Sequence, residues 1–168
     1  MLRFFAILGI IGLAQAGVLL TNGDFEQPLD TGWEQSSSGG TYVVINRATN
    51  YDSDPDYEAG VTIDSLAGGG IAQLWQEVFI PTTDLQFSAN IKLYAWDNNA
   101  DTLCCGGAAL IINYLDESGS LLGDTKICRF TDPFPWSNTS TSHLIVAPNI
   151  EWNNYAFNIN DELNSLLT

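Results

Sequence analysis

Basic residues are scarce in this chain of 168 residues. Lys and Arg together number five, against 20 Asp and Glu, and the formal net charge is −15. Proteins that bind nucleic acids neutralise phosphates with Lys and Arg, so this balance argues against a nucleic acid partner. Charged residues make up only 15% of the chain, whereas hydrophobic residues make up 45%. Surface helices prefer Ala, Glu, Lys and Arg, and this composition instead favours strands joined by turns.

Histidine and cysteine are also rare, with one His (His143) and three Cys (Cys104, Cys105 and Cys128). These residues are too few and too dispersed for a Cys/His metal site. The chain contains no P-loop, no HExxH and no Ser–His–acid spacing, and no pair of carboxylates is singled out, so we predict that it is not an enzyme. A disulfide from Cys104 or Cys105 to Cys128 would contribute about 3 kcal/mol. The odd thiol would stay free or pair between chains.

Long apolar runs are absent except at the N-terminus. Residues 1–16 combine one basic residue, an apolar run and the small-residue pattern Ala14-Gln15-Ala16, which is typical of a cleaved secretory signal peptide. The run is shorter than the roughly 20 residues that a membrane-spanning helix needs. We therefore predict a secreted or cell-surface protein without a membrane span, whose mature part is a single domain of residues 17–168.

Short alternating segments separated by turns occupy most of that domain. In residues 85–96, LQFSANIKLYAW, apolar and polar side chains alternate strictly, which predicts a strand with one buried face. A short helix is predicted at residues 160–167, with Asn160 as its N-cap. About eight or nine strands predict an all-β antiparallel sandwich. The other strand segments are residues 41–48, 58–65, 71–81, 108–115, 120–130, 142–148 and 153–160.

Several motifs occur in a recognisable order: NGDFE at residues 22–26, Gly32-Trp33, LWQEVFIP at 74–81, LQFSA at 85–89, YLDESG at 114–119 and WNNYAFNI at 152–159. The ordered set resembles the carbohydrate-binding modules of families 4, 9 and 22, which have a jelly-roll sandwich of the galactose-binding-like kind. The resemblance implies a secreted, non-catalytic module. In that family, further strands follow the last tryptophan motif, so we expect residues 17–168 to be a C-terminally truncated module that lacks its last strand or strands.

The resemblance also implies a structural Ca²⁺ ion near the first strand. Calcium takes about six to eight oxygen ligands, which carboxylates and backbone carbonyls supply. Asp24 and Glu26 of the NGDFE motif would contribute, with Glu58 or Asp64 as the further carboxylate. The acidic loop DSDPDYE at residues 52–58 contains Pro55 and lacks the glycine of an EF-hand loop. We interpret it as a solvated acidic turn.

Sugar binding needs aromatic faces for pyranose rings and planar polar groups for hydroxyls. The predicted strands at residues 71–81 and 85–96 offer both on their outward faces, and Tyr114 joins them if its strand pairs alongside. We expect Trp33 and Trp152 to lie in the core. The candidate carbohydrate-binding residues are Trp75, Glu77, Gln86, Asn90, Tyr94, Trp96 and Tyr114.

Two hypotheses for the function remain open. The first is a secreted module that binds a polysaccharide or glycan, including the case of an accessory domain of a glycoside hydrolase. The second is a structural or adhesion module of an extracellular assembly, since one fold serves many functions. An unclosed sheet edge beside the first strand or the odd cysteine would then support self-association.

Overall fold

The computed structural model describes residues 2–5, 19–40, 42–64, 69–96, 105–132 and 135–166, with backbone only at residues 2–5. The fold is all-β with one short helix, as predicted. One sheet has six strands in the order β2-β5-β1-β7-β8-β9, and two further pairs are β10–β6 and β3–β4. The strands are β1 (Leu2–Phe5), β2 (Glu34–Ser38), β3 (Tyr42–Ala48), β4 (Glu58–Asp64), β5 (Ile71–Val78), β6 (Gln86–Ile91), β7 (Gly107–Leu115), β8 (Leu121–Phe130), β9 (Ser142–Val146) and β10 (Asn153–Asn158).

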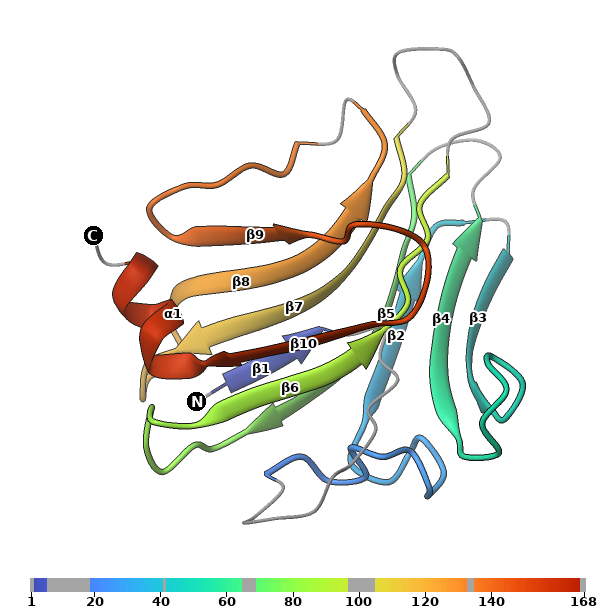
Figure 1. Ribbon diagram of the computed structural model, residues 1–168, viewed down its shortest axis with the longest axis horizontal. Coiled ribbons are helices and arrows are strands. Elements are labelled where there is room, and N and C mark those ends of the chain that lie inside the picture. Colours follow the sequence, from blue (N-terminus) through green and yellow to red (C-terminus); the bar gives the residue numbers. More distant parts are fainter. Residues whose placement is uncertain are drawn as a thin grey trace.

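The β6–β10 pair crosses in front of the six-stranded sheet, and the β3–β4 hairpin stands beside both (Figure 1). Side chains from the facing surfaces of the two layers form one hydrophobic core, which is the arrangement of a β-sandwich. Most neighbouring strands are antiparallel, but β9 runs parallel to β8. The core residues at the centre of this interface are Leu74, Leu110, Ile112 and Ile127 from one layer and Phe87, Ala89 and Ile91 from the other.

The alternation in residues 85–96 predicted the burial of β6 correctly. Phe87, Ala89 and Ile91 are buried, whereas Gln86 and Ser88 are exposed. Strand pairing ends at Ile91, but the alternation of buried and exposed side chains continues to residue 96. This segment therefore presents one outward face along its whole length.

The predicted C-terminal helix is α1 (Ile159–Leu166), and its cap differs from the prediction. The side-chain oxygen of Asn158, not that of Asn160, accepts a hydrogen bond from a backbone N–H at the start of the helix, that of Asn160, at 2.9 Å. The helix begins one residue earlier because the side chain at Asn158 completes its first turn. Within the described residues, no helix has the length and apolar character that crossing a bilayer requires.

The segment around the NGDFE motif forms turns rather than the strand expected for it. Asn22 and Phe25 have positive φ angles of 51° and 55°, which breaks any extended conformation. Phe25 and Trp33 are nonetheless buried, as predicted, and their ring centroids lie 5.2 Å apart. The indole N–H of Trp33 donates to the carbonyl of Asn22 at 2.9 Å, which ties the turn to the core.

β1 lies inside the segment that the sequence predicts to be a cleaved leader. It is antiparallel to both β5 and β7 and separates them. With β1 in this place, β2 and β9 are the edges of the six-stranded sheet, so β2, the first described strand of residues 17–168, lies at a sheet edge. Leader cleavage itself stays a prediction.

The expected disulfide to Cys128 does not form. Cys128 is a free, buried thiol on β8, and burial raises its pKa to about 11. Cys105 is also free and lies exposed before β7. The strand register explains the difference, because Ala109 is the residue opposite Cys128 and Cys105 lies four positions before Ala109. Cys104 lies outside the described residues.

Candidate functional site

The predicted carbohydrate-binding residues do not form one surface. Trp75 and Glu77 lie on β5 in the six-stranded sheet, whereas Gln86 and Asn90 lie on β6, which pairs with β10. Because the inner faces of both layers contribute to one core, the outer faces point away from each other on opposite sides of the sandwich. The expectation that the strands at residues 71–81 and 85–96 share one binding face is therefore wrong.

Tyr114 lies in the core rather than on an outward face. It is 2% exposed, and its hydroxyl lies 2.9 Å from that of Thr125. Burial raises the pKa of the Tyr114 hydroxyl well above its usual value. In β7, Leu110, Ile112 and Tyr114 share the inward face, so the alternation itself removes Tyr114 from contact with any ligand.

The outward face of the β6–β10 pair keeps four of the predicted residues together. Gln86 is opposite Asn158, Ser88 is opposite Ala156, and Asn90 is opposite Asn154 in the strand register. Opposite residues of an antiparallel pair share a face, so amide and hydroxyl side chains form a polar surface across both strands. Sequence reasoning missed the contribution of β10, although Asn154 and Asn158 are four residues apart and therefore lie on the same face of a strand.

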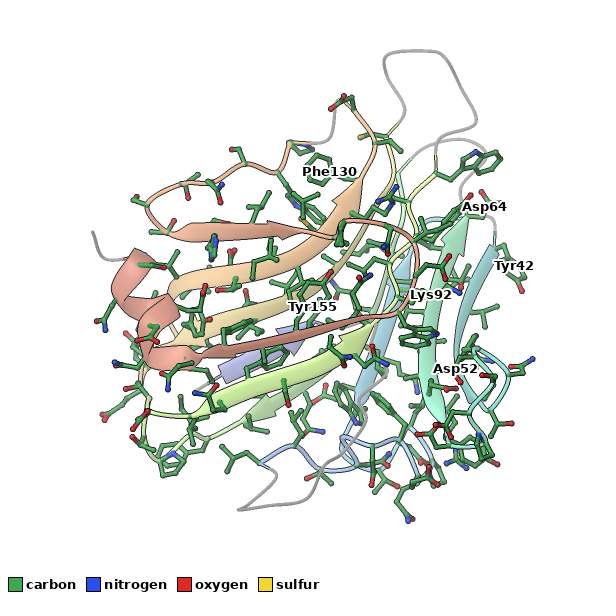
Figure 2. The ribbon with its side chains drawn as sticks, viewed as in Figure 1. Tyr42, Asp52, Asp64, Lys92, Phe130 and Tyr155 are labelled. Atoms are coloured by element: carbon green, nitrogen blue, oxygen red, sulfur yellow. The ribbon has the colours of Figure 1, made fainter. Side chains whose placement is uncertain are left out.

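Two exposed aromatic side chains extend this surface beyond the end of β6. Tyr94 and Trp96 are 62% and 58% exposed, and Leu93 between Lys92 and Tyr94 is buried. Figure 2 shows Lys92 just past the end of β6, where this extension begins. The two rings are two residues apart on the same side of the chain, so both are available to a ligand. We call the surface formed by Gln86, Ser88, Asn90, Lys92, Tyr94, Trp96 and Asn154 the β6–β10 face.

The single histidine connects the helix to the six-stranded sheet. Nδ1 of His143 on β9 lies 2.6 Å from Oε2 of Glu162 on α1, and the same oxygen accepts a hydrogen bond from the hydroxyl of Thr125 at 2.9 Å. Thr125 is fully buried, so no substrate reaches its hydroxyl. The group therefore fastens α1 to β8 and β9, and it does not have the geometry of a nucleophile with its base.

Among the described residues, the carboxylates expected to hold calcium do not form one cluster of potential ligands. Oδ1 of Asp24 lies 3.4 Å from the backbone nitrogen of Glu26, and Oε1 of Glu26 accepts a hydrogen bond from the backbone N–H of Tyr57 at 3.2 Å. Glu58 instead lies with Asp52 and Asp56, and carboxylate oxygens of these three residues are all within 4.8 Å of one another. The loop interpreted as a solvated turn thus brings carboxylates together, because the β3–β4 hairpin folds it back on itself.

Similarity to known proteins gives no indication of the function. Neither the models of known protein families, nor the curated proteins, nor the solved structures contain a match to this chain.

Proposed function

We propose that this protein is a secreted, non-catalytic β-sandwich of the jelly-roll, galactose-binding-like kind that binds polysaccharide on the β6–β10 face. The observation that supports this most directly is the exposure of Tyr94 and Trp96 in line with the amide side chains of β6. An aromatic ring offers an apolar surface for the flat face of a pyranose, and amides supply donors and acceptors for its hydroxyls.

The shape of the face favours an extended ligand. Its side chains follow one another at every second residue from Gln86 to Trp96, so they form a row rather than a closed pocket. A row of this kind contacts several successive units of a linear glycan. Trp75 and Glu77, on the opposite side of the sandwich, have no part in this binding.

The charge of the chain narrows the class of ligand. The formal net charge is −15, and Lys92 is the single basic residue on the β6–β10 face. A polyanionic glycan would be repelled by the molecule as a whole. We therefore propose that the ligand is a neutral polysaccharide such as a β-glucan or xylan.

Isothermal titration with soluble xylan, mixed-linkage β-glucan and laminarin tests the proposal. Trp96→Ala should weaken binding about tenfold, because an aromatic contact contributes up to about 1.5 kcal/mol. Phe79→Ala is the matched control, because Phe79 is 72% exposed but follows β5 of the other layer. The control should bind like the wild type.

Two outcomes would contradict the proposal. One is a wild-type protein that binds none of these glycans at millimolar concentration. The other is an equal loss of affinity in Trp96→Ala and Phe79→Ala, since a site on the β6–β10 face cannot depend on an aromatic residue of the opposite layer.

A further inference from the structure

Three carboxylates converge at one end of the β3–β4 hairpin. Asp52 and Asp56 belong to the loop between the strands, and Glu58 is the first residue of β4. Figure 2 shows Asp52 at this end, with Tyr42 and Asp64 at the other end of the hairpin. One oxygen from each of the three carboxylates lies within 4.8 Å of the other two. We call these three residues the acidic triad.

Glu58 makes the acidic triad more than a surface cluster. Its side chain is 6% exposed, and both of its carboxylate oxygens are buried. Within the described part of the chain, no N–H or hydroxyl donor reaches either oxygen, and the side chain that contacts the Glu58 carboxyl is another acid, Asp52. A buried carboxylate without a partner is strongly unfavourable, because it has lost its hydration and received nothing in exchange. Its oxygens point toward two further carboxylates. A bound cation would therefore stabilise the negative charge at this site.

Among the side chains that the structure describes, none supplies that cation. Across the described residues, none of the three carboxylates of the acidic triad forms an ion pair. Arg47 on β3 is engaged elsewhere, since its Nη1 donates to the carbonyl of Phe25 at 2.8 Å. The guanidinium carbon of Arg47 also lies 3.6 Å from the ring centroid of Tyr57.

We propose that the acidic triad binds one calcium ion through Asp52, Asp56 and Glu58. Calcium takes about six to eight oxygen ligands in a flexible geometry, and carboxylate oxygens that all lie within 4.8 Å of one another can share one such ion. Magnesium demands a near-ideal octahedral geometry and gives up its water ligands reluctantly, so three carboxylates of a loop and a strand end suit it less well. This ligand set differs from the one implied by the NGDFE motif, because it omits Asp24 and Glu26.

The surroundings of the acidic triad allow the protein to supply some of the ligands of a calcium ion and water to supply the others. Asp52 is exposed and Asp56 is half-buried, so water has access to the side of the ion opposite Glu58. Oδ1 of Asp52 also accepts a hydrogen bond from the backbone N–H of Asp54 at 2.7 Å, and this turn holds the loop in shape. A bound ion would fasten the loop at Asp52 to the start of β4 at Glu58.

Calcium titration of the EDTA-treated protein tests the site. With CaCl₂ at a hundredfold excess over its Kd, the melting temperature of the wild type should rise by about 5–10 °C. Isothermal titration should give one ion per chain. MgCl₂ at the same concentration should produce a smaller rise in melting temperature.

Substitutions in the acidic loop test whether calcium binds at the acidic triad. Glu58→Gln and Asp52→Asn should each lower the calcium affinity by about tenfold or more, since both remove a charge from the triad. Asp54→Asn is the matched control, because Asp54 is an exposed acid of the same loop outside the triad. It should retain the wild-type response. Asp52 is exposed, so Asp52→Asn tests the site without changing a buried group.

Three results would overturn the proposal: a wild type that does not respond to calcium, an equal response to magnesium, or variants that all respond like Asp54→Asn. The proposal does not depend on sugar binding. Trp96→Ala should keep the full calcium response, so failure of one site is distinguishable from failure of the other.

Discussion

At the scale of single residues, Glu58 shows the sharpest conflict between burial and charge. Burial, followed by the charges of Asp52 and Asp56, raises its pKa from 4.5 to about 7. Between these pH values the folded protein binds more protons than the unfolded chain does. The free energy of unfolding contributed by Glu58 therefore falls as the pH rises from 4.5 to 7. The shift corresponds to a destabilisation of about 3 kcal/mol above pH 7.

Glu58→Gln should remove this pH dependence. In EDTA at pH 8, the variant should melt above the wild type, because a neutral amide replaces a buried charge. At pH 5.5, where Glu58 is mostly protonated, the difference between the two proteins should be much smaller. Calorimetry at both pH values measures the effect. Asp54→Asn should keep the pH dependence of the wild type, and a Glu58→Gln protein less stable than the wild type at pH 8 would contradict the argument.

At the scale of elements, Gly60 on β4 provides the space that positions the acidic loop. A Cβ at this position would overlap the hydroxyl and ring of Tyr51. The hydroxyl of Tyr51 is hydrogen-bonded to Oδ1 of Asn46 on β3, and Tyr51 directly precedes Asp52. The tyrosine ring over Gly60 therefore determines where the loop places Asp52.

Gly60→Ala should weaken calcium binding about tenfold while all three carboxylates remain. The added methyl group displaces Tyr51, and Asp52 moves with it. Gly69→Ala is the control, since a Cβ there meets no atom within 4 Å. The double variant Gly60→Ala/Tyr51→Ala should regain part of the affinity, because the ring that clashes has been removed. An unchanged affinity in Gly60→Ala would show that Tyr51 does not position the loop.

The strands themselves were largely predictable because their signal is local. The alternation in residues 85–96 identifies both the strand and its buried face, and Gly119 marks the turn between β7 and β8 with a φ of 83°. Which strands become neighbours is a nonlocal matter. β5 and β6 follow each other in the chain but belong to different layers, so the predicted face that joined Trp75 to Trp96 could not be judged from sequence.

The two candidate sites also differ in whether a local sequence pattern predicts them. Tyr94 and Trp96 lie outward as the alternation predicts. The acidic triad was missed because the relevant contact joins the middle of a loop to the first residue of β4. Burial of Glu58 was the deciding feature, and a charged residue gives no sequence signal of being buried.

At the scale of the whole molecule, β1 joins two parts of the six-stranded sheet, β2–β5 and β7–β8–β9. A chain that starts at Gly17 lacks this strand. Because adjacent strands are about 4.8 Å apart, β5 and β7 would then face each other across about 9.6 Å, each with unpaired backbone groups. Such facing edges accept an extended segment from another molecule.

We predict that the chain of residues 17–168 self-associates in a concentration-dependent manner. Size-exclusion chromatography with light scattering measures the mass directly. A synthetic peptide of residues 1–8, which covers β1, should return the protein to the monomer when added in excess. A clean monomer at high protein concentration without the peptide would count against this prediction.

The position of Lys92 affects how this protein can be attached to a surface. The chain has two lysines, and Lys126 is largely covered and paired with Asp124 on β8, so Lys92 is the more accessible of the two. Amine-reactive coupling at a lysine would therefore attach the molecule through Lys92 and turn Tyr94 and Trp96 toward the support, whereas coupling at the α-amino group would not use this face. A sensor chip or resin prepared through Lys92 would hide the proposed glycan site. Attachment through the exposed thiol of Cys105 would not avoid this loss, because its neighbour Gly106 packs against the backbone of Trp96.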